Sequence, residues 1–232
     1  MKKCCLHLSR LALLLVLPLL LSTPSASAQE LPDGFVRVRE VIPAAVQDVR
    51  YFTARNFVGQ RIDGYVAPEV ILTTQATNAL AKVQAELKPF GLGLKIFDGY
   101  RPQSAVDHFV RWAKDTTDTR TKLEYYPEVD KKHLFRDGYI AAQSGHSRGS
   151  TVDVTIIGLD TGLELDMGTT FDHFGKESWP GNEMMPVHVR ANRMLLRTIM
   201  VENGFKPLRE EWWHFTLKDE PHPSTYFDFA VQ

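Results

Sequence analysis

Apolar residues recur with the period of a helix in the first half of the chain, over residues 68–88. The positions on this apolar face are Leu72, Ala76, Ala79, Leu80, Val83 and Leu87. Pro68 stands where a helix tolerates proline, in the first turn, and Pro89 stands where proline ends one. The same period predicts two further helices, over residues 104–113 and 186–203.

Shorter segments with alternating or β-branched apolar residues predict strands. They cover residues 35–41, 48–52, 92–97, 151–157 and 212–217. Residues 115–145 are polar and have neither period, so we expect a loop that carries functional residues. Helices come early, strands fill the middle and the end, and the two do not alternate regularly. This order predicts an α+β fold, a single domain with a central, mostly antiparallel sheet and flanking helices.

The N-terminal residues have the pattern of an export signal. A basic start precedes an apolar run over residues 11–21, and Ala26-Ser27-Ala28 follows as a cleavage site. We therefore predict a signal peptide over residues 1–28 and a catalytic domain over residues 29–232, in the periplasm or secreted. The apolar run is shorter than the about 20 residues of a membrane span, so we expect no stable membrane insertion after cleavage. An uncleaved N-terminal anchor is the alternative.

Composition narrows the class of protein further. Both cysteines, Cys4 and Cys5, lie inside the predicted signal, so the exported chain must rely on its core rather than on disulfides. Loss of the signal leaves 24 basic residues against 28 acidic ones, a net charge near −4. This charge argues against nucleic acid or another polyanion as a partner, and it permits a small zwitterionic substrate. The oligomeric state is unknown from the sequence.

The first candidate for chemistry is the pair His146 and Asp153. Gly149 and the β-branched stretch 151–157 make a continuous helix unfavourable here. A turn that presents His146, followed by a strand that carries Asp153, brings both groups to one metal ion. The alternative is a surface histidine beside a solvated aspartate.

The second candidate is the segment Glu211-Trp212-Trp213-His214. Side chains alternate along a strand, so the neighbouring aromatic residues flank His214 and exclude water from a pocket. Two imidazoles and a carboxylate are the usual ligands of a catalytic zinc and leave a fourth position for water. Together with His146 and Asp153, this segment predicts a zinc hydrolase with its metal site at the sheet. A core aromatic strand beside an exposed acid is the alternative.

Four motifs together resemble the zinc D-alanyl-D-alanine dipeptidases, which are known from vancomycin resistance and from scavenging of cell-wall dipeptide. They are Asp-Gly-Tyr-Arg-Pro at 98–102, Ser-Gly-His-Ser-Arg-Gly-Ser at 144–150 followed by Asp153, Asp-Met-Gly-Thr-Thr-Phe-Asp at 166–172, and Glu-Trp-Trp-His at 211–214. The motifs occur in the order of that family and extend over most of the exported chain. One departure is Gly145, where the resistance enzymes have a second serine.

The resemblance implies a role for each matching residue. It implies one zinc ion per chain with His146, Asp153 and His214 as its ligands. Glu211 becomes the general base that takes a proton from the attacking water. Arg101 becomes the group that stabilises the charge developing on the carbonyl oxygen; pairing with Asp98 as a loop anchor is its other interpretation. The substrate contacts implied for D-Ala-D-Ala are Asp172, for the ammonium group, with Tyr51 and Ser144.

Three functions remain in competition. The preferred one is zinc-dependent hydrolysis of D-Ala-D-Ala in cell-wall turnover or scavenging, because Asp172 provides an acid for a free ammonium group. A zinc D,D-carboxypeptidase or an L-Ala-D-Glu endopeptidase, acting on longer peptidoglycan peptides, has no need of that acid. A non-catalytic metal-containing protein that binds wall peptides has no need of Glu211.

Overall fold

The computed structural model describes residue 1 and residues 30–232. The predicted signal peptide, with its two cysteines, therefore lies outside the described residues except for Met1. No helix within the described part is both long and apolar enough to cross a bilayer.

The centre of the molecule is a five-stranded sheet with the strand order β2-β4-β5-β7-β6. Its strands are β2 (Val46–Gln47), β4 (Leu92–Asp98), β5 (Thr151–Gly158), β6 (Phe205–Pro207) and β7 (His214–Leu217). Only the pairing of β2 with β4 is parallel; the other neighbours are antiparallel. A separate antiparallel pair consists of β1 (Phe35–Arg37) and β3 (Ile71–Thr73). The predicted α+β class with a mostly antiparallel sheet is confirmed.

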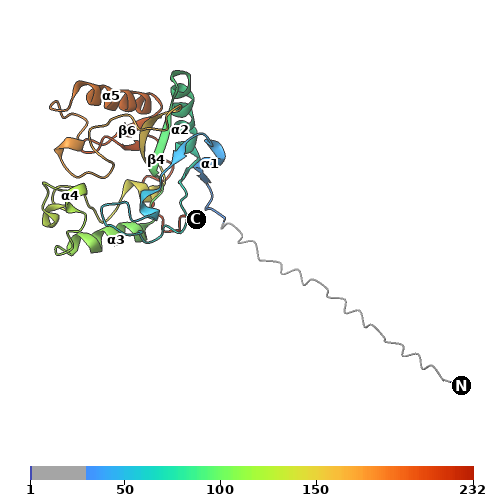
Figure 1. The fold of residues 1–232 in the computed structure, drawn as a ribbon, viewed down its shortest axis with the longest axis horizontal. Coiled ribbons are helices and arrows are strands. Elements are labelled where there is room, and N and C mark those ends of the chain that lie inside the picture. Colours follow the sequence, from blue (N-terminus) through green and yellow to red (C-terminus); the bar gives the residue numbers. More distant parts are fainter. Residues whose placement is uncertain (2–29) are drawn as a thin grey trace.

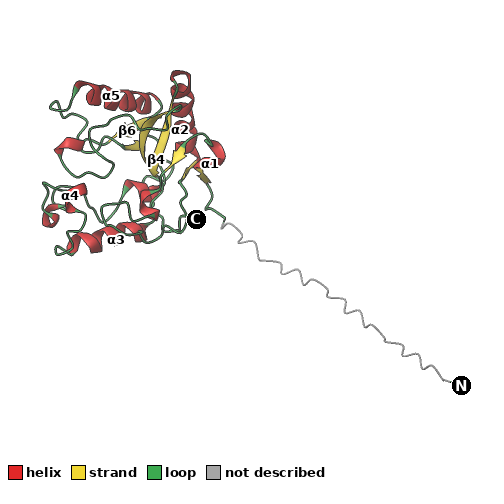
Figure 2. Ribbon diagram, viewed as in Figure 1, coloured by secondary structure: helices red, strands yellow, loops and turns green. Residues whose placement is uncertain are grey.

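Helices flank this sheet, whose strands lie in the middle of Figure 2. They are α1 (Val38–Val41), α2 (Thr74–Leu87), α3 (Gln103–Lys114), α4 (Lys122–Tyr125) and α5 (Val187–Glu202). In Figure 1, α2 and α5 lie near β4 and β6, whereas α3 and α4 lie on the opposite side of the molecule. The predicted loop over residues 115–145 contains no strand, but it includes the short helix α4 besides 3₁₀ turns.

Strand β5 divides the core from the site. Val152, Val154 and Ile156 are fully buried in the hydrophobic core. Because successive side chains of a strand point to opposite faces, Asp153 lies on the other face. The sheet therefore buries one side of β5 among apolar side chains and turns the other toward polar groups.

Two of the predicted strands differ from the observed structure. Residues 48–52 were expected as a strand, but Arg50–Phe52 form a 3₁₀ turn. Local bonds favour the turn, because the Asp48 carboxylate accepts a hydrogen bond from Arg50 Nε at 2.9 Å. The predicted strand 35–41 ends at Arg37, and the next four residues form α1.

Two further elements begin later in the structure than the sequence predicts. Helix α2 begins at Thr74 rather than Pro68, because residues Ile71–Thr73 pair with β1 as β3. The side chain of Thr73 then caps the helix by accepting a hydrogen bond from the Ala76 amide. Strand β7 begins at His214, so the two tryptophans of the motif precede it.

Candidate metal centre

Three adjacent strands bring acidic and imidazole side chains into one row. Asp153 of β5 pairs in register with His214 of β7 on one side and with Asp98 of β4 on the other. Residues directly opposite each other in a sheet project to the same face. A register irregularity in β4 between Ile96 and Asp98 shifts Asp98 into this row. The sheet itself thus assembles most of the site.

His146 reaches the same point from the 3₁₀ turn Gly145–Arg148, just before β5. The turn begins with the Ser144 hydroxyl, which accepts a hydrogen bond from the His146 amide, and ends at Gly149. His146 Nδ1 donates to the carbonyl oxygen of Gly99 at 2.7 Å. Burial lowers the pKa of this imidazole, so it is neutral and its Nε2 lone pair faces the row.

The donor atoms have the separations of a tetrahedral zinc site. His146 Nε2 lies 3.3 Å from His214 Nδ1 and 3.2 Å from Asp153 Oδ2, and His214 Nδ1 lies 3.2 Å from Asp153 Oδ1. Ligand atoms about 2.0–2.1 Å from a tetrahedral zinc ion are roughly 3.3 Å apart. Asp153 Oδ1 is also buried without a hydrogen-bond partner. These three residues fit a zinc ion.

Glu211 lies at the edge of this cluster. Its Oε2 atom is 3.4 Å from His214 Nδ1, and the residue directly precedes the two tryptophans before β7. Burial raises the pKa of Glu211 to about 7, although nearby His214 opposes the change. A carboxyl group with this pKa exchanges protons readily near neutral pH.

Arg101 is held in place from several directions. Its Nε donates to Asp98 Oδ2 at 2.9 Å, and its Nη2 lies 3.5 Å from Asp153 Oδ2. Its guanidinium stacks on the rings of Tyr51 and Phe109, at 4.9 and 5.2 Å from their centroids. The pairing with Asp98 foreseen as an alternative is therefore real, and it fixes Arg101 beside the metal ligands rather than away from them.

Tyr65 is a part of the site that the sequence reasoning missed. Its hydroxyl donates to Asp98 Oδ1 at 2.6 Å, and both residues are buried. No recognised motif contains Tyr65, and its partner Asp98 is 33 residues away. The contact depends on tertiary structure, and no local pattern signals it.

Tyr51 and Asp172 form a buried pair behind Arg101. The Tyr51 hydroxyl lies 2.9 Å from Asp172 Oδ2 and 3.2 Å from Oδ1, and 3.5 Å from Arg101 Nη2. Burial, with the nearby charge of Asp153, raises the pKa of Asp172 well above its ordinary value. Asp172 has a left-handed backbone, with φ at 63°.

A cavity of about 210 Å³ opens beside these groups. Of the predicted site residues, Arg101, Ser144, Glu211 and His214 line it. Its apolar wall comes from α3, from the loop after α4 and from Leu208, through Val106, Phe109, Tyr139, Ile140 and Leu208. Tyr51 and Asp172 are not among its lining residues, but Tyr51 contacts Arg101, which lines the cavity. The predicted functional loop thus supplies one side of the cavity.

Two neighbours of the first motif have structural contacts. Arg148 forms two hydrogen bonds with Glu220, at 2.8 and 2.9 Å. A side chain at Gly145 would approach Thr151 Oγ1 to 2.9 Å, so a larger residue there requires a local shift.

Two imidazoles and a carboxylate at the spacing of a metal ion, with a free carboxyl group and a guanidinium beside them, define a metal-dependent hydrolase. Comparison with known proteins shows the family. A family model described as D-ala-D-ala dipeptidase matches residues 32–232. The chain belongs to this family of metallopeptidases.

Individual relatives agree with this assignment. The D-alanyl-D-alanine dipeptidase of Enterococcus faecalis is 43% identical over 86% of this chain and 98% of its own. That of Streptomyces coelicolor is 44% identical over 85% and 98%, and that of Escherichia coli is 31% identical over 80% and 84%. Among solved structures, a mutant of the vancomycin-resistance D,D-pentapeptidase VanY in complex with Zn(II) is 13% identical. It covers 66% of this chain and 76% of its own, with a TM-score of 0.39.

Proposed function

We propose that this chain hydrolyses the free dipeptide D-Ala-D-Ala with one zinc ion held by His146, Asp153 and His214. The observation that carries the proposal is the cluster of His146 Nε2, His214 Nδ1 and the Asp153 carboxylate beside Glu211 and Arg101, in which each pair of residues has donor atoms 3.2–3.3 Å apart. When bound, zinc makes water a nucleophile at neutral pH and polarises the peptide carbonyl.

The side chains around the metal ligands transfer the proton and stabilise the developing charge. Glu211, with a pKa of about 7, takes the proton of the attacking water and passes it to the leaving amine. Arg101 donates to the carbonyl oxygen as negative charge develops there. Because Asp98 and two aromatic rings already hold the guanidinium, it needs little rearrangement during the reaction.

Recognition of a dipeptide depends on the size of the cavity and on the buried Tyr51–Asp172 pair. A volume of about 210 Å³ is below the roughly 300–1,000 Å³ of sites for drug-sized ligands, so a small substrate fits it better. The Asp172 carboxyl, held by Tyr51, is the partner we assign to the substrate ammonium group. An ammonium ion there would favour the ionised form of Asp172, which burial otherwise disfavours.

Hydrolysis of longer wall peptides, as by a D,D-carboxypeptidase or an L-Ala-D-Glu endopeptidase, is the second candidate. The small cavity and the buried acid favour the dipeptide. The test compares release of D-Ala from D-Ala-D-Ala and from N-acetyl-D-Ala-D-Ala by zinc-loaded protein. We expect the free dipeptide to be the better substrate by about 10²-fold or more, because blocking the amine leaves Asp172 unpaired. Equal or faster cleavage of the acetylated peptide would contradict the dipeptidase assignment.

The role of Glu211 has its own test. Glu211→Gln should keep about one zinc per chain by metal analysis and lower kcat by about 10²–10⁴-fold. Loss of zinc in this variant would make Glu211 a ligand instead of a base. Wild-type protein with no bound zinc after purification and reconstitution would favour the non-catalytic binding protein.

We further infer that the enzyme works outside the cytoplasm, in turnover or scavenging of the cell wall. The predicted signal over residues 1–28 supports this location. Fractionation of cells that express the full chain should place the protein, shortened by 28 residues, in the exported fraction. Full-length protein in the cytosol would refute the inference.

A further inference from the structure

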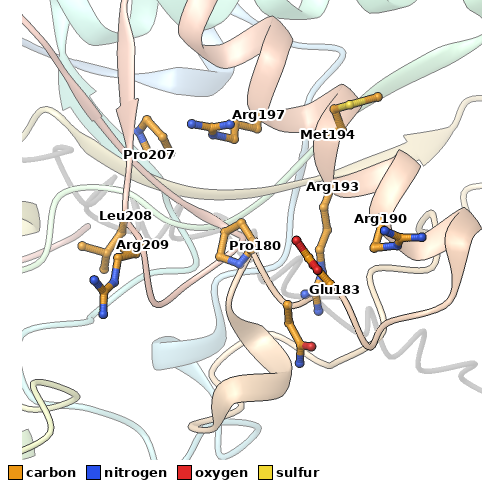
Figure 3. Close-up of a pocket in the computed structure, with 11 residues that line it drawn as sticks. Pro180, Glu183, Arg190, Arg193, Met194, Arg197, Pro207, Leu208 and Arg209 are labelled. Atoms are coloured by element: carbon orange, nitrogen blue, oxygen red, sulfur yellow. The ribbon is translucent and has the colours of Figure 1, made fainter.

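A second and larger cavity, of about 550 Å³, lies beside α5. Figure 3 shows its residues on two sides, with α5 on one and the segment Pro207–Arg209 on the other, and Pro180 between them. The volume is within the range of small-molecule sites, roughly 300–1,000 Å³. Leu208 lines both this cavity and the catalytic one. None of the motifs of the catalytic site contributes to it.

Four arginines converge on this cavity, and we call it the basic pocket. Arg190, Arg193 and Arg197 of α5 are three and four residues apart, which places them on one face of the helix. Arg209 lines the other side of the cavity, from the connection between β6 and β7. Glu183 is the only acidic residue among those that line the pocket. This concentration of positive charge is local, because the whole chain has a net charge of −1.

Two of these arginines are exposed and have no partner. The side chains of Arg190 and Arg197 form no hydrogen bond or ion pair with any residue that the structure describes. Arg209 is only partly engaged, through a hydrogen bond to Glu210 at 3.1 Å and a stacking contact with Trp179 at 5.4 Å. Neighbouring like charges repel each other on a helix, so this arrangement is unfavourable without a bound anion.

Arg193 is the buried base of the pocket, with an exposure of 3%. Its guanidinium donates to three backbone carbonyls, those of Met167 at 2.8 Å, Trp179 at 3.1 Å and Glu177 at 2.7 Å. No carboxylate of the described residues binds it directly. Burial lowers the pKa of Arg193 to about 10, and the charge of Asp166 offsets this only in part. The carbonyls fix the side chain, but its positive charge is not neutralised by an ion pair.

We propose that the basic pocket binds a small organic anion with two oxyanion groups, either carboxylates or phosphates. A guanidinium matches the planar oxygen pairs of both groups, and each such bond between charges is among the stronger hydrogen bonds. The apolar side chains of Pro180, Met194 and Pro207 accommodate the carbon skeleton between the two groups. The size of the pocket and the acidic chain as a whole favour a small anion over a polymer.

The test measures binding by titration calorimetry on zinc-loaded protein at low ionic strength. The probes are glutarate and 1,3-propanediol bisphosphate, with acetate and methyl phosphate as single-charge comparisons. We expect at least one of the two dianions to bind about tenfold or more tightly than its single-charge analogue. The variant Arg190→Gln/Arg197→Gln should weaken this binding by about tenfold or more. Whether the carboxylate or the phosphate probe binds better distinguishes the two chemistries.

A charge-matched control separates the pocket from net charge and from the zinc site. Lys82 and Lys114 are exposed, lie on α2 and α3 and do not line the basic pocket. Lys82→Gln/Lys114→Gln should therefore retain the wild-type affinity. Unchanged binding in the double arginine variant would refute the proposal, since its zinc site is intact and binding there would persist. Equal weakening in the lysine control, or no preference for either dianion, would refute it as well. Binding is read without turnover, so the outcome is independent of the proposed catalysis.

Discussion

Gly149 makes the loop between two proposed zinc ligands sensitive to a single methyl group. Its φ of +82° lies in the left-handed region, and a Cβ atom would come within 2.7 Å of Phe35 Cζ, with Cε1 nearer still. The conformation costs a non-glycine residue about 1–2 kcal/mol, and overpacking typically adds about 1–3 kcal/mol. We therefore expect Gly149→Ala to lower the free energy of unfolding by about 2–5 kcal/mol, or Tm by roughly 4–20 °C.

Urea unfolding followed by circular dichroism measures this loss, and metal analysis follows the site. Zinc affinity should fall as well, because Gly149 bonds to the turn of His146 through its amide, at 2.9 Å, and to Thr73 through its carbonyl. Gly162→Ala is the matched control, since Gly162 has φ +68° and open space around its Cα. It should cost only the about 1–2 kcal/mol of the backbone conformation. If the two variants lose the same stability, the steric argument at Phe35 is wrong.

Three further predictions concern the groups around the metal ligands. Arg101→Lys should lower kcat by about 10²–10³-fold with unchanged zinc content, because lysine lacks the planar fork that bonds to Asp98; normal turnover would refute the role. Asp172→Asn should raise KM about tenfold or more yet raise Tm, since asparagine tolerates the left-handed backbone and removes a buried acid. Burial raises the pKa of Asp172, so the buried carboxyl destabilises the fold only above its unfolded-state pKa, and increasingly as pH rises. The gain in Tm of the variant should therefore be larger at pH 8 than at pH 5; a loss of Tm would contradict this. Removal of zinc by a chelator should lower Tm by about 5–10 °C and readdition should restore it, as followed by calorimetry; an unchanged Tm would argue against a ligand-held metal.

The sequence predicts elements well where one physical signal dominates. Helices α3 and α5 and strands β4 and β5 agree with their apolar periods to within one or two residues. It predicts less well where tertiary contacts override local preference. Residues Ile71–Thr73 continue the apolar pattern of α2, yet they pair with β1 because that strand satisfies their backbone groups.

The site, too, was predictable from the sequence only in part. Spacing and motifs place His146, Asp153 and His214 together, and the structure brings their donor atoms within 4.8 Å of one another. The row with Asp98 depends on a register shift in β4, which no single-strand pattern contains. The basic pocket was missed for a related reason, because its arginines come from one helix face and from a distant loop.

The row of side chains across β4, β5 and β7 has a consequence for folding. The donor atoms of His146 and His214 belong to residues 68 positions apart, and they meet only when β5 and β7 have paired in register. A slip of one residue would turn Asp153 toward the opposite face of the sheet. We therefore expect metal binding to follow long-range strand pairing and to stabilise only chains with the correct register. A chain that folds before it acquires zinc would bind the ion last, and the bound ion would then stabilise the correct alignment of its strands.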